Sequence, residues 1–262
     1  MRALRLVLAL WLLVVLPAAA DCVMMVRMDE DPPYLRVLPD GRAGGVNADV
    51  VREALKRIGC RADFRALPFS RSLKELEEGT LDIVPDLFRT PEREAYTRYS
   101  RTANRVPNRL FVRAADRARW SILSFEDLPR LGIKLGIEAG ALASPNFAQV
   151  EADPQFRAIV TPVRTHESLW RMLSAGRIDA VILDEQSARW ELTHFGYAGT
   201  IVGTDFIAAA APAYFGFSRA SVREDQVRAF DRAVEDMRHD GTLAAILATY
   251  GLEATAAINI SE

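Results

Sequence analysis

The sequence lacks several features that would have pointed to particular functions. It has two cysteines and three histidines among 262 residues, and 33 basic against 35 acidic side chains. Such a balance gives no basic surface for nucleic acid, which we exclude as a partner. No phosphate-binding loop, nucleophile elbow or metal-ligand spacing occurs, so we expect no cofactor and no metal.

Histidine gives no catalytic pattern either. His166, His194 and His239 fall in stretches with helical character and are far apart in the sequence. We expect each of them to be a solvated helix residue.

The first twenty residues have the three parts of a secretory signal. Met1 to Arg5 carries two arginines, Leu6 to Leu16 is apolar, and Ala18 to Ala20 precedes Asp21. An apolar run of about 11 residues is shorter than the roughly 20 that a spanning helix needs. We therefore expect a signal peptide at 1–20, cleavage after Ala20 and a periplasmic location. No later stretch is apolar and long enough to span a bilayer.

The two cysteines are expected to pair. Cys22 opens the apolar run Val23 to Val26, and Cys60 follows Gly59 at the end of a predicted helix and leads into a second predicted strand. In a βαβ unit both would lie at the same end of neighbouring parallel strands, and export favours oxidation. Two free thiols remain the alternative.

Strands and helices alternate along the rest of the chain, which indicates an α/β fold. Asn47 is a predicted helix cap, and Thr90-Pro91-Glu92 is a strong helix start because it combines a capping hydroxyl, a first-turn proline and an acid.

One pattern occurs twice. Leu76 to Val84 (LEEGTLDIV) resembles Leu173 to Val181 (LSAGRIDAV), and each is a helix end, a glycine stop and an apolar strand. Asp86 follows the first copy and Asp184 the second. The repeat indicates two similar lobes, each directing the carboxyl end of a strand at one cleft, where ligands of open α/β sheets bind. Chance similarity of two ordinary turns is the alternative.

A set of short segments, in order, resembles a known family. The segments are Pro32-Pro33-Tyr34, Gly45 to Asp49, Pro68 to Arg71, Leu76 to Asp82, Thr90 to Arg93, Gly136 to Gly140, Gly176 to Asp184 and Asp240 to Leu243. The chain is similar to the type II periplasmic solute-binding proteins of ABC importers, family 3, in the branch that binds polar amino acids.

That resemblance implies the domain organisation. Lobe 1 would comprise 21–113 plus 211–262 and lobe 2 would comprise 114–210, with mainly parallel sheets around a ligand cleft. Two crossing segments, near 111–114 and 207–211, would form the hinge, and a ligand would close the lobes.

The resemblance also assigns site residues. Arg93 would grip a ligand carboxylate, because a guanidinium pairs with a carboxylate through two parallel hydrogen bonds. Asp184 would receive the ligand ammonium, and Tyr34 would stack on the ligand side chain. Phe69 and Arg71 would form a pocket wall. The alternatives are a surface arginine, a helix-capping acid and a rim packing residue.

The chain departs from the family pattern at two places. Asp86 brings a second acid towards the cleft, in a segment that is one residue shorter than usual. After Gly140, Ala141 and Leu142 replace the hydroxyl residues that usually help to hold the carboxylate. The departures favour weaker carboxylate recognition, and a cationic or amine-bearing ligand or a less polar acid.

Three functions remain open at this point. The leading hypothesis is a monomeric, non-enzymatic binding protein that delivers a small polar solute, such as an amino acid, to an ABC permease in the inner membrane. The second is an enzyme on the same fold, a dehydratase similar to those acting on a prephenate-like acid, with Asp86 as its acid or base. The third is a sensory module for a membrane receptor.

Overall fold

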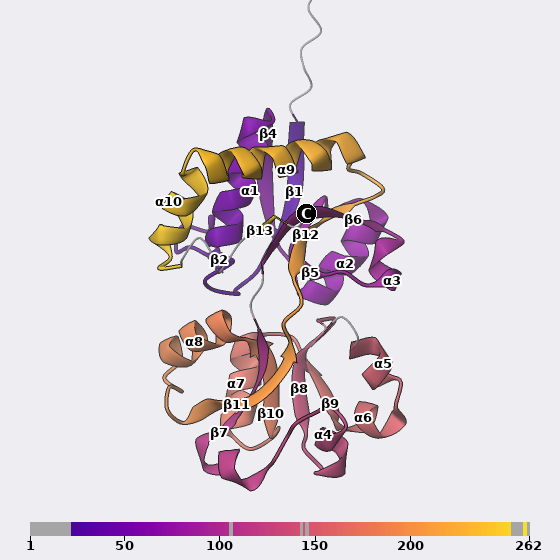
Figure 1. The fold of residues 1–262 in the computed structure, drawn as a ribbon, viewed down its shortest axis with the longest axis vertical. Helices are drawn as coiled ribbons and strands as arrows, with labels where there is room; N and C mark the ends of the chain where they lie inside the picture. Colours follow the sequence, from indigo (N-terminus) through magenta and orange to yellow (C-terminus); the bar gives the residue numbers. More distant parts are fainter. Residues whose placement is uncertain (1–21, 105–106, 142–143, 145–146, 253–258, 261–262) are drawn as a thin grey trace, which may run out of the picture.

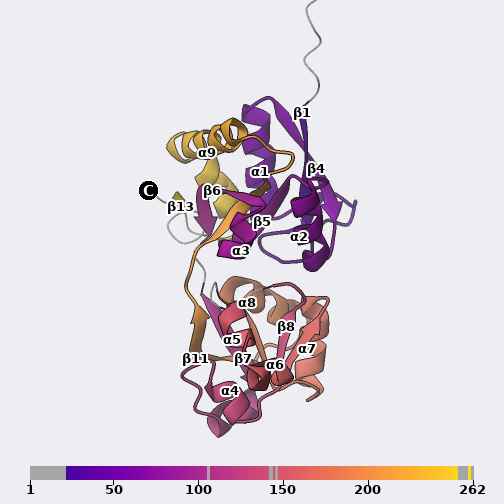
Figure 2. The same ribbon diagram turned by 90° about the vertical axis from the view of Figure 1, so that its right-hand side faces the viewer.

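A computed structural model describes residues 22–104, 107–141, 144, 147–252 and 259–260. The proposed signal peptide and Leu142 lie outside these ranges. The chain forms two α/β lobes stacked along its long axis, joined by two crossing segments (Figures 1 and 2). None of the described helices has the length and apolarity needed to cross a membrane.

Lobe 1 is built on a sheet of six strands with the order β13-β6-β12-β5-β1-β4. The strands are β1 (Cys22–Met28), β4 (Cys60–Ala66), β5 (Ile83–Phe88), β6 (Thr97–Asn104), β12 (Ala213–Ser218) and β13 (Asn259–Ile260). The helices are α1 (Val46–Arg57), α2 (Phe69–Glu78), α3 (Pro91–Glu94), α9 (Glu224–His239) and α10 (Thr242–Thr249), and β2 (Arg36–Val37) pairs with β3 (Ala43–Gly44).

Lobe 2 is built on a five-stranded sheet with the order β11-β7-β10-β8-β9. Its strands are β7 (Asn108–Arg113), β8 (Leu135–Glu138), β9 (Val160–Val163), β10 (Ala180–Asp184) and β11 (Ile201–Ala209). Its helices are α4 (Asp127–Arg130), α5 (Phe147–Glu151), α6 (Pro154–Ile159), α7 (His166–Ser174) and α8 (Glu185–His194), with a 3-10 helix at Ala114–Arg119.

The two sheets have the same plan. Strands β4, β1, β5 and β6 of lobe 1 run in one direction, as do β9, β8, β10 and β11 of lobe 2. The strand inserted against this direction, β12 in lobe 1 and β7 in lobe 2, is the one that arrives from the other lobe. Two similar lobes with mainly parallel sheets are therefore confirmed.

The repeated segments occupy equivalent places in the two lobes. The first copy is the end of α2 and the start of β5, and the second is the end of α7 and the start of β10. Gly79 and Gly176 end their helices with φ of +78° and +70°, a conformation that glycine adopts without the steric cost of a Cβ atom.

The crossing segments correct one expectation. Residues 108–113 were expected in lobe 1, but β7 pairs with β10 and β11, so it belongs to the sheet of lobe 2. The first crossing thus precedes Asn108. The hinge does not lie at 111–114, because Phe111 and Val112 are paired with β10 on one side and β11 on the other. The second crossing follows β11 at 210–212 and leads into β12.

The predicted disulfide is present. Cys22 and Cys60 are register partners at the start of the parallel strands β1 and β4, with a Cα–Cα distance of 4.5 Å. The pair closes a loop of 38 residues. It joins two strands of the lobe 1 sheet away from the carboxyl ends of those strands.

Apolar packing covers both faces of each sheet. Helices α1 and α9 bury Val50, Leu55, Phe230 and Val234 with Val26 and Phe217 on one face of the lobe 1 sheet. Leu76 of α2 packs with Val84 and Leu87 on the other face. Burial of this kind, worth about 25 cal/mol per Å² of apolar surface, makes each sheet a firm base for its strand ends.

Candidate functional site

A cavity lies between the lobes at the carboxyl ends of their parallel strands. Lobe 1 contributes Arg27, Asp31, Tyr34, Phe69, Asp86, Phe88, Arg93 and Ala213, lobe 2 contributes Asn108, Ile137, Glu138, Ala141, His166, Ile182, Leu183 and Asp184, and Ala211 comes from the second crossing. Open α/β sheets bind ligands at these strand ends. The cavity is thus the candidate ligand site.

Six of the eight residues expected at the site line this cavity. They are Tyr34, Phe69, Asp86, Arg93, Ala141 and Asp184. Arg71 does not: its side chain is 65% exposed and its Nε donates to Glu75 Oε1 at 2.8 Å. Gly140 contributes through its carbonyl oxygen, which accepts from Arg93 Nη2 at 3.1 Å across the lobes.

Arg93 is a buried cation that faces the cavity. Thr90 caps α3 as predicted, with its hydroxyl accepting from the Arg93 backbone N–H at 3.3 Å. The residue is only 5% exposed, and Nη1 donates to the carbonyl of Phe88 at 3.3 Å. Among the described residues no carboxylate lies within 4.0 Å of its guanidinium. Burial lowers the pKa of Arg93, against smaller opposing contributions from Tyr96, Tyr99 and Glu92.

Asp86 sits in an unusual backbone conformation within β5. Its φ is +56°, in the left-handed region that aspartate tolerates at a cost. The strand register shifts here, between the pairs Leu87–Tyr214 and Val84–Gly216, so Asp86 occupies a bulge. The Asn47 amide donates to its carboxylate. Asp86 lines the cavity from this bulge.

Asn47 corrects a second expectation. Helix α1 begins at Val46 with Gly45 as its cap, so Asn47 is not the cap residue. Asn47 is fully buried, and its side-chain amide donates to the carboxylate of Asp86 within lobe 1.

Asp184 caps a helix and faces the cavity. Its Oδ1 accepts the backbone N–H groups of Gln186 at 3.1 Å and Ser187 at 2.9 Å, at the start of α8. Burial raises the pKa of Asp184, although the hydrogen bonds from Ser187 act in the opposite direction. Capping therefore does not remove the side chain from the cleft.

Aromatic rings form the wall on the lobe 1 side. Tyr34 is 3% exposed, and its hydroxyl has no hydrogen-bond partner among the described residues. Burial raises the pKa of this phenol. The Phe69 ring lies 4.8 Å from the Arg27 guanidinium and 5.8 Å from that of Arg93. The Phe69 ring thus makes a favourable cation–π contact with each of the two guanidiniums.

A comparison with models of known protein families identifies the family. A model of the bacterial extracellular solute-binding proteins, family 3, matches residues 24–253. The chain belongs to this family.

The relatives of this family-3 protein are distant in sequence. It is 21% identical to a probable amino-acid-binding protein, YxeM of Bacillus subtilis, over 80% of this chain and 77% of that protein. The structure is similar to a mutant of ArgBP from T. maritima, with a TM-score of 0.74, 18% identity and coverage of 87% and 94%. It is also similar to EhuB in complex with hydroxyectoine, with a TM-score of 0.75, 23% identity and coverage of 89% and 90%.

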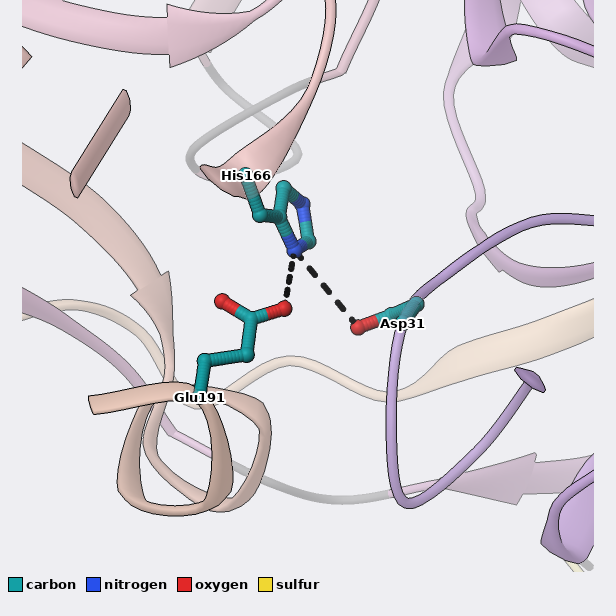
Figure 3. Close-up of side chains that lie close together, drawn as sticks. All are labelled: Asp31, His166 and Glu191. Carbon is teal, nitrogen blue, oxygen red and sulfur yellow. Dashed lines mark hydrogen bonds and ion pairs between the residues drawn. The ribbon is translucent and has the colours of Figure 1, made fainter. Parts of the chain in front are cut away.

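The family-3 chain has an ionic cluster that its sequence did not reveal. His166, at the first turn of α7, is 8% exposed and not the solvated residue expected. Its Nδ1 lies 2.8 Å from Glu191 Oε1 and 3.9 Å from Asp31 Oδ1, and its Nε2 lies 3.6 Å from Glu138 Oε2. Figure 3 shows Asp31 approaching from lobe 1 and the other two drawn residues from lobe 2.

The cluster is electrostatically coupled. Burial alone would lower the pKa of His166, but Glu191 and Glu138 raise it well above its usual value. Burial raises the pKa of Asp31 strongly, against the charge of His166. Arg27 contacts the same cluster, 3.7 Å from Glu138 and 2.6 Å from Asp29. The other two histidines are exposed, as expected.

Proposed function

We propose that this protein captures an amino-acid-like solute that carries both a carboxylate and a cationic group, by closure of its lobes. The protein then delivers the solute, from the periplasm, to an ABC permease in the inner membrane. Membership of the family supports solute binding, and the name of the B. subtilis relative supports an amino acid.

The observation that carries the proposal is the buried Arg93 guanidinium, which no carboxylate of the described residues meets within 4.0 Å. Transferring an isolated charge from water into a protein is costly unless a counter-ion meets it. A ligand carboxylate entering the cavity would be that counter-ion, and the planar fork of arginine suits it. The Ala141 N–H already donates to Glu138 O at 3.0 Å, which leaves the carboxylate more dependent on Arg93.

The remaining charges favour a cationic group on the same ligand. Four carboxylates line the cavity, those of Asp31, Asp86, Glu138 and Asp184, against the two guanidiniums and one imidazole. Asp86 and Asp184 come from opposite lobes, two and three residues after the respective copies of the repeat. Both carboxylates repel the charge of Asp31, and an ammonium or guanidinium in the cavity would offset this repulsion. An arginine-bound form of ArgBP from T. maritima is known.

Lobe closure is supported by contacts that cross the cleft. Ser187 Oγ of lobe 2 donates to Asp31 Oδ1 of lobe 1 at 2.7 Å, and Arg93 of lobe 1 donates to Gly140 of lobe 2. Polar contacts of this kind are reversible in water, which suits a hinge that opens and closes.

A thermal-shift screen of the mature protein tests the proposal. Arginine, lysine, other amino acids, polyamines and small organic acids are the candidates, since a ligand of the native state raises the melting temperature. Calorimetry with a hit then compares Arg93→Ala with Arg71→Ala. We expect Arg93→Ala to cost about 2–5 kcal/mol, a loss of roughly 30- to 5,000-fold in affinity.

Arg71→Ala is the matched control, because it removes a guanidinium from the same lobe but outside the cavity, and its affinity should equal that of the wild type. Equal affinity of both variants would overturn the assignment of Arg93. Chemical turnover of a hit, followed by chromatography, would overturn binding as the function and favour the dehydratase hypothesis.

A further inference from the structure

We propose that Asp31, His166 and Glu191 form a binding site for one divalent transition-metal ion, Zn²⁺ above all, that joins the two lobes. The three residues each offer one ligand atom, and these atoms all lie within 4.8 Å of one another (Figure 3). The site goes beyond solute binding and does not depend on the identity of the solute.

The distances between the ligand atoms fit a small metal ion after modest side-chain movement. Tetrahedral Zn²⁺ with bonds of about 2.0–2.2 Å places its ligand atoms about 3.3 Å apart. His166 Nδ1 lies 2.8 Å from Glu191 Oε1 and 3.9 Å from Asp31 Oδ1. The first distance must lengthen and the second shorten by about half an ångström each. The Asp31–Glu191 pair, which lies within 4.8 Å, must shorten by up to about 1.5 Å, and rotation of the two carboxylates provides these movements.

The donor set selects the class of metal. One imidazole nitrogen and two carboxylate oxygens suit zinc and its neighbours, whereas Ca²⁺ takes six to eight oxygen ligands. Three protein ligands leave a fourth position for water or another small ligand. The two cysteines of the chain form the disulfide, so no thiolate competes for the ion.

Each of the three ligands has a polar neighbour that holds it in place. Trp170 Nε1 donates to Glu191 Oε2 at 2.5 Å, and Ser187 Oγ donates to Asp31 Oδ1 at 2.7 Å. Glu138 Oε2 lies 3.6 Å from His166 Nε2, the ring nitrogen that would stay protonated. A carboxylate behind a ligating imidazole is a common support of metal sites, because it fixes the tautomer and strengthens the donor.

The charges leave room for a cation. Three carboxylates surround His166, and Arg27 contacts one of them, Glu138, at 3.7 Å. Glu191 is 1% exposed, so hydration does little to stabilise its negative charge.

The position of the site gives the ion a structural effect and a route of access. Asp31 belongs to lobe 1, in the loop after β1, whereas His166 and Glu191 belong to α7 and α8 of lobe 2. An ion held by all three therefore favours closed lobes. The same three residues line a second pocket with Glu30, Glu167 and Trp190, by which an ion can enter beside the ligand cavity.

The test is a zinc titration of tag-free, EDTA-treated protein against a chromophoric chelator of known affinity. We expect one Zn²⁺ per chain. His166→Gln should weaken binding by at least about 100-fold, since loss of a group that only supports a metal ligand already costs 10- to 100-fold. Asp31→Asn, a change in a loop of the other lobe, should weaken binding similarly and covers the case in which His166→Gln fails to fold.

His239→Gln is the control, because His239 is exposed and pairs with Glu235 at 2.7 Å in α9, far from the cluster. Its affinity should equal that of the wild type. Co²⁺ in place of Zn²⁺ should give visible absorption bands that His166→Gln loses. No stoichiometric binding by the wild type, or binding that survives in both His166→Gln and Asp31→Asn, would overturn the site.

Discussion

Replacement of Gly140 by alanine should block closure of the lobes while leaving each lobe folded. Gly140 lies in the loop after β8 of lobe 2 with φ of +86°. A Cβ atom there would stand 2.9 Å from Ser70 Cα and 3.0 Å from Ser70 Cβ, in α2 of lobe 1. The clash therefore exists only when the lobes are together.

The magnitude follows from two separate costs. Alanine at positive φ destabilises lobe 2 by about 1–2 kcal/mol in the open and closed forms alike. The contact with Ser70 is with backbone atoms that cannot rotate away, and overpacking of this kind costs about 1–3 kcal/mol. Only the second cost acts on closure, so the affinity for a solute should fall by roughly 5- to 150-fold.

Gly196→Ala separates the two costs. Gly196 has φ of +76°, lies in the same lobe and has no atom within 4 Å of a built Cβ, so it carries the backbone strain without the clash. Calorimetric titration of both variants, with the solute selected by the thermal-shift screen, measures the difference. Small-angle scattering of the solute-bound forms should show a more extended Gly140→Ala. Equal affinities in the two variants would refute a closure contact at Gly140.

Two further predictions concern stability. Replacing both Cys22 and Cys60 by serine should lower the unfolding free energy by about 2–4 kcal/mol, since a loop of 38 residues is released; an unchanged urea midpoint would contradict this. Asp240 accepts hydrogen bonds from Thr242 and from Arg57, which hold its pKa at about 2, below the usual 3.8. Its contribution is present above pH 4 and lost as the pH falls towards 2, so Asp240→Asn should melt below the wild type at pH 7, with the gap narrowing at pH 3; a gap independent of pH would contradict it.

The fold was predictable because its decisive signals are local. The glycine stop between helix and strand, repeated at Gly79 and Gly176, needs only a few neighbouring residues, and it fixed the equivalent cores of the two lobes. The disulfide followed from two cysteines at the starts of neighbouring strands. Thr90 capped its helix as predicted, and so Arg93 reached the cavity.

The errors concern contacts that only the tertiary fold creates. The boundary of lobe 1 was placed six residues too late, because 108–113 form a strand whose partners, β10 and β11, lie far along the chain. Asparagine favours the helix cap, which predicts that position for Asn47, but the half-buried carboxylate of Asp86 holds its amide instead. The preference of asparagine for a helix cap is overridden here, because a hydrogen bond to a residue distant in sequence pairs the buried Asn47 amide.

His166 was misjudged for a related reason, although one signal could have found it. Asp31, Glu138 and Glu191 are distant in sequence, so no spacing pattern joins them to His166. Yet His166 follows Thr165 at the start of a helix that comes after a strand, as Arg93 follows β5 and as Asp184 ends β10. In parallel sheets such positions all meet at the cleft. Applied to every strand and not only to the repeated pair, this rule would have placed the histidine beside the ligand site.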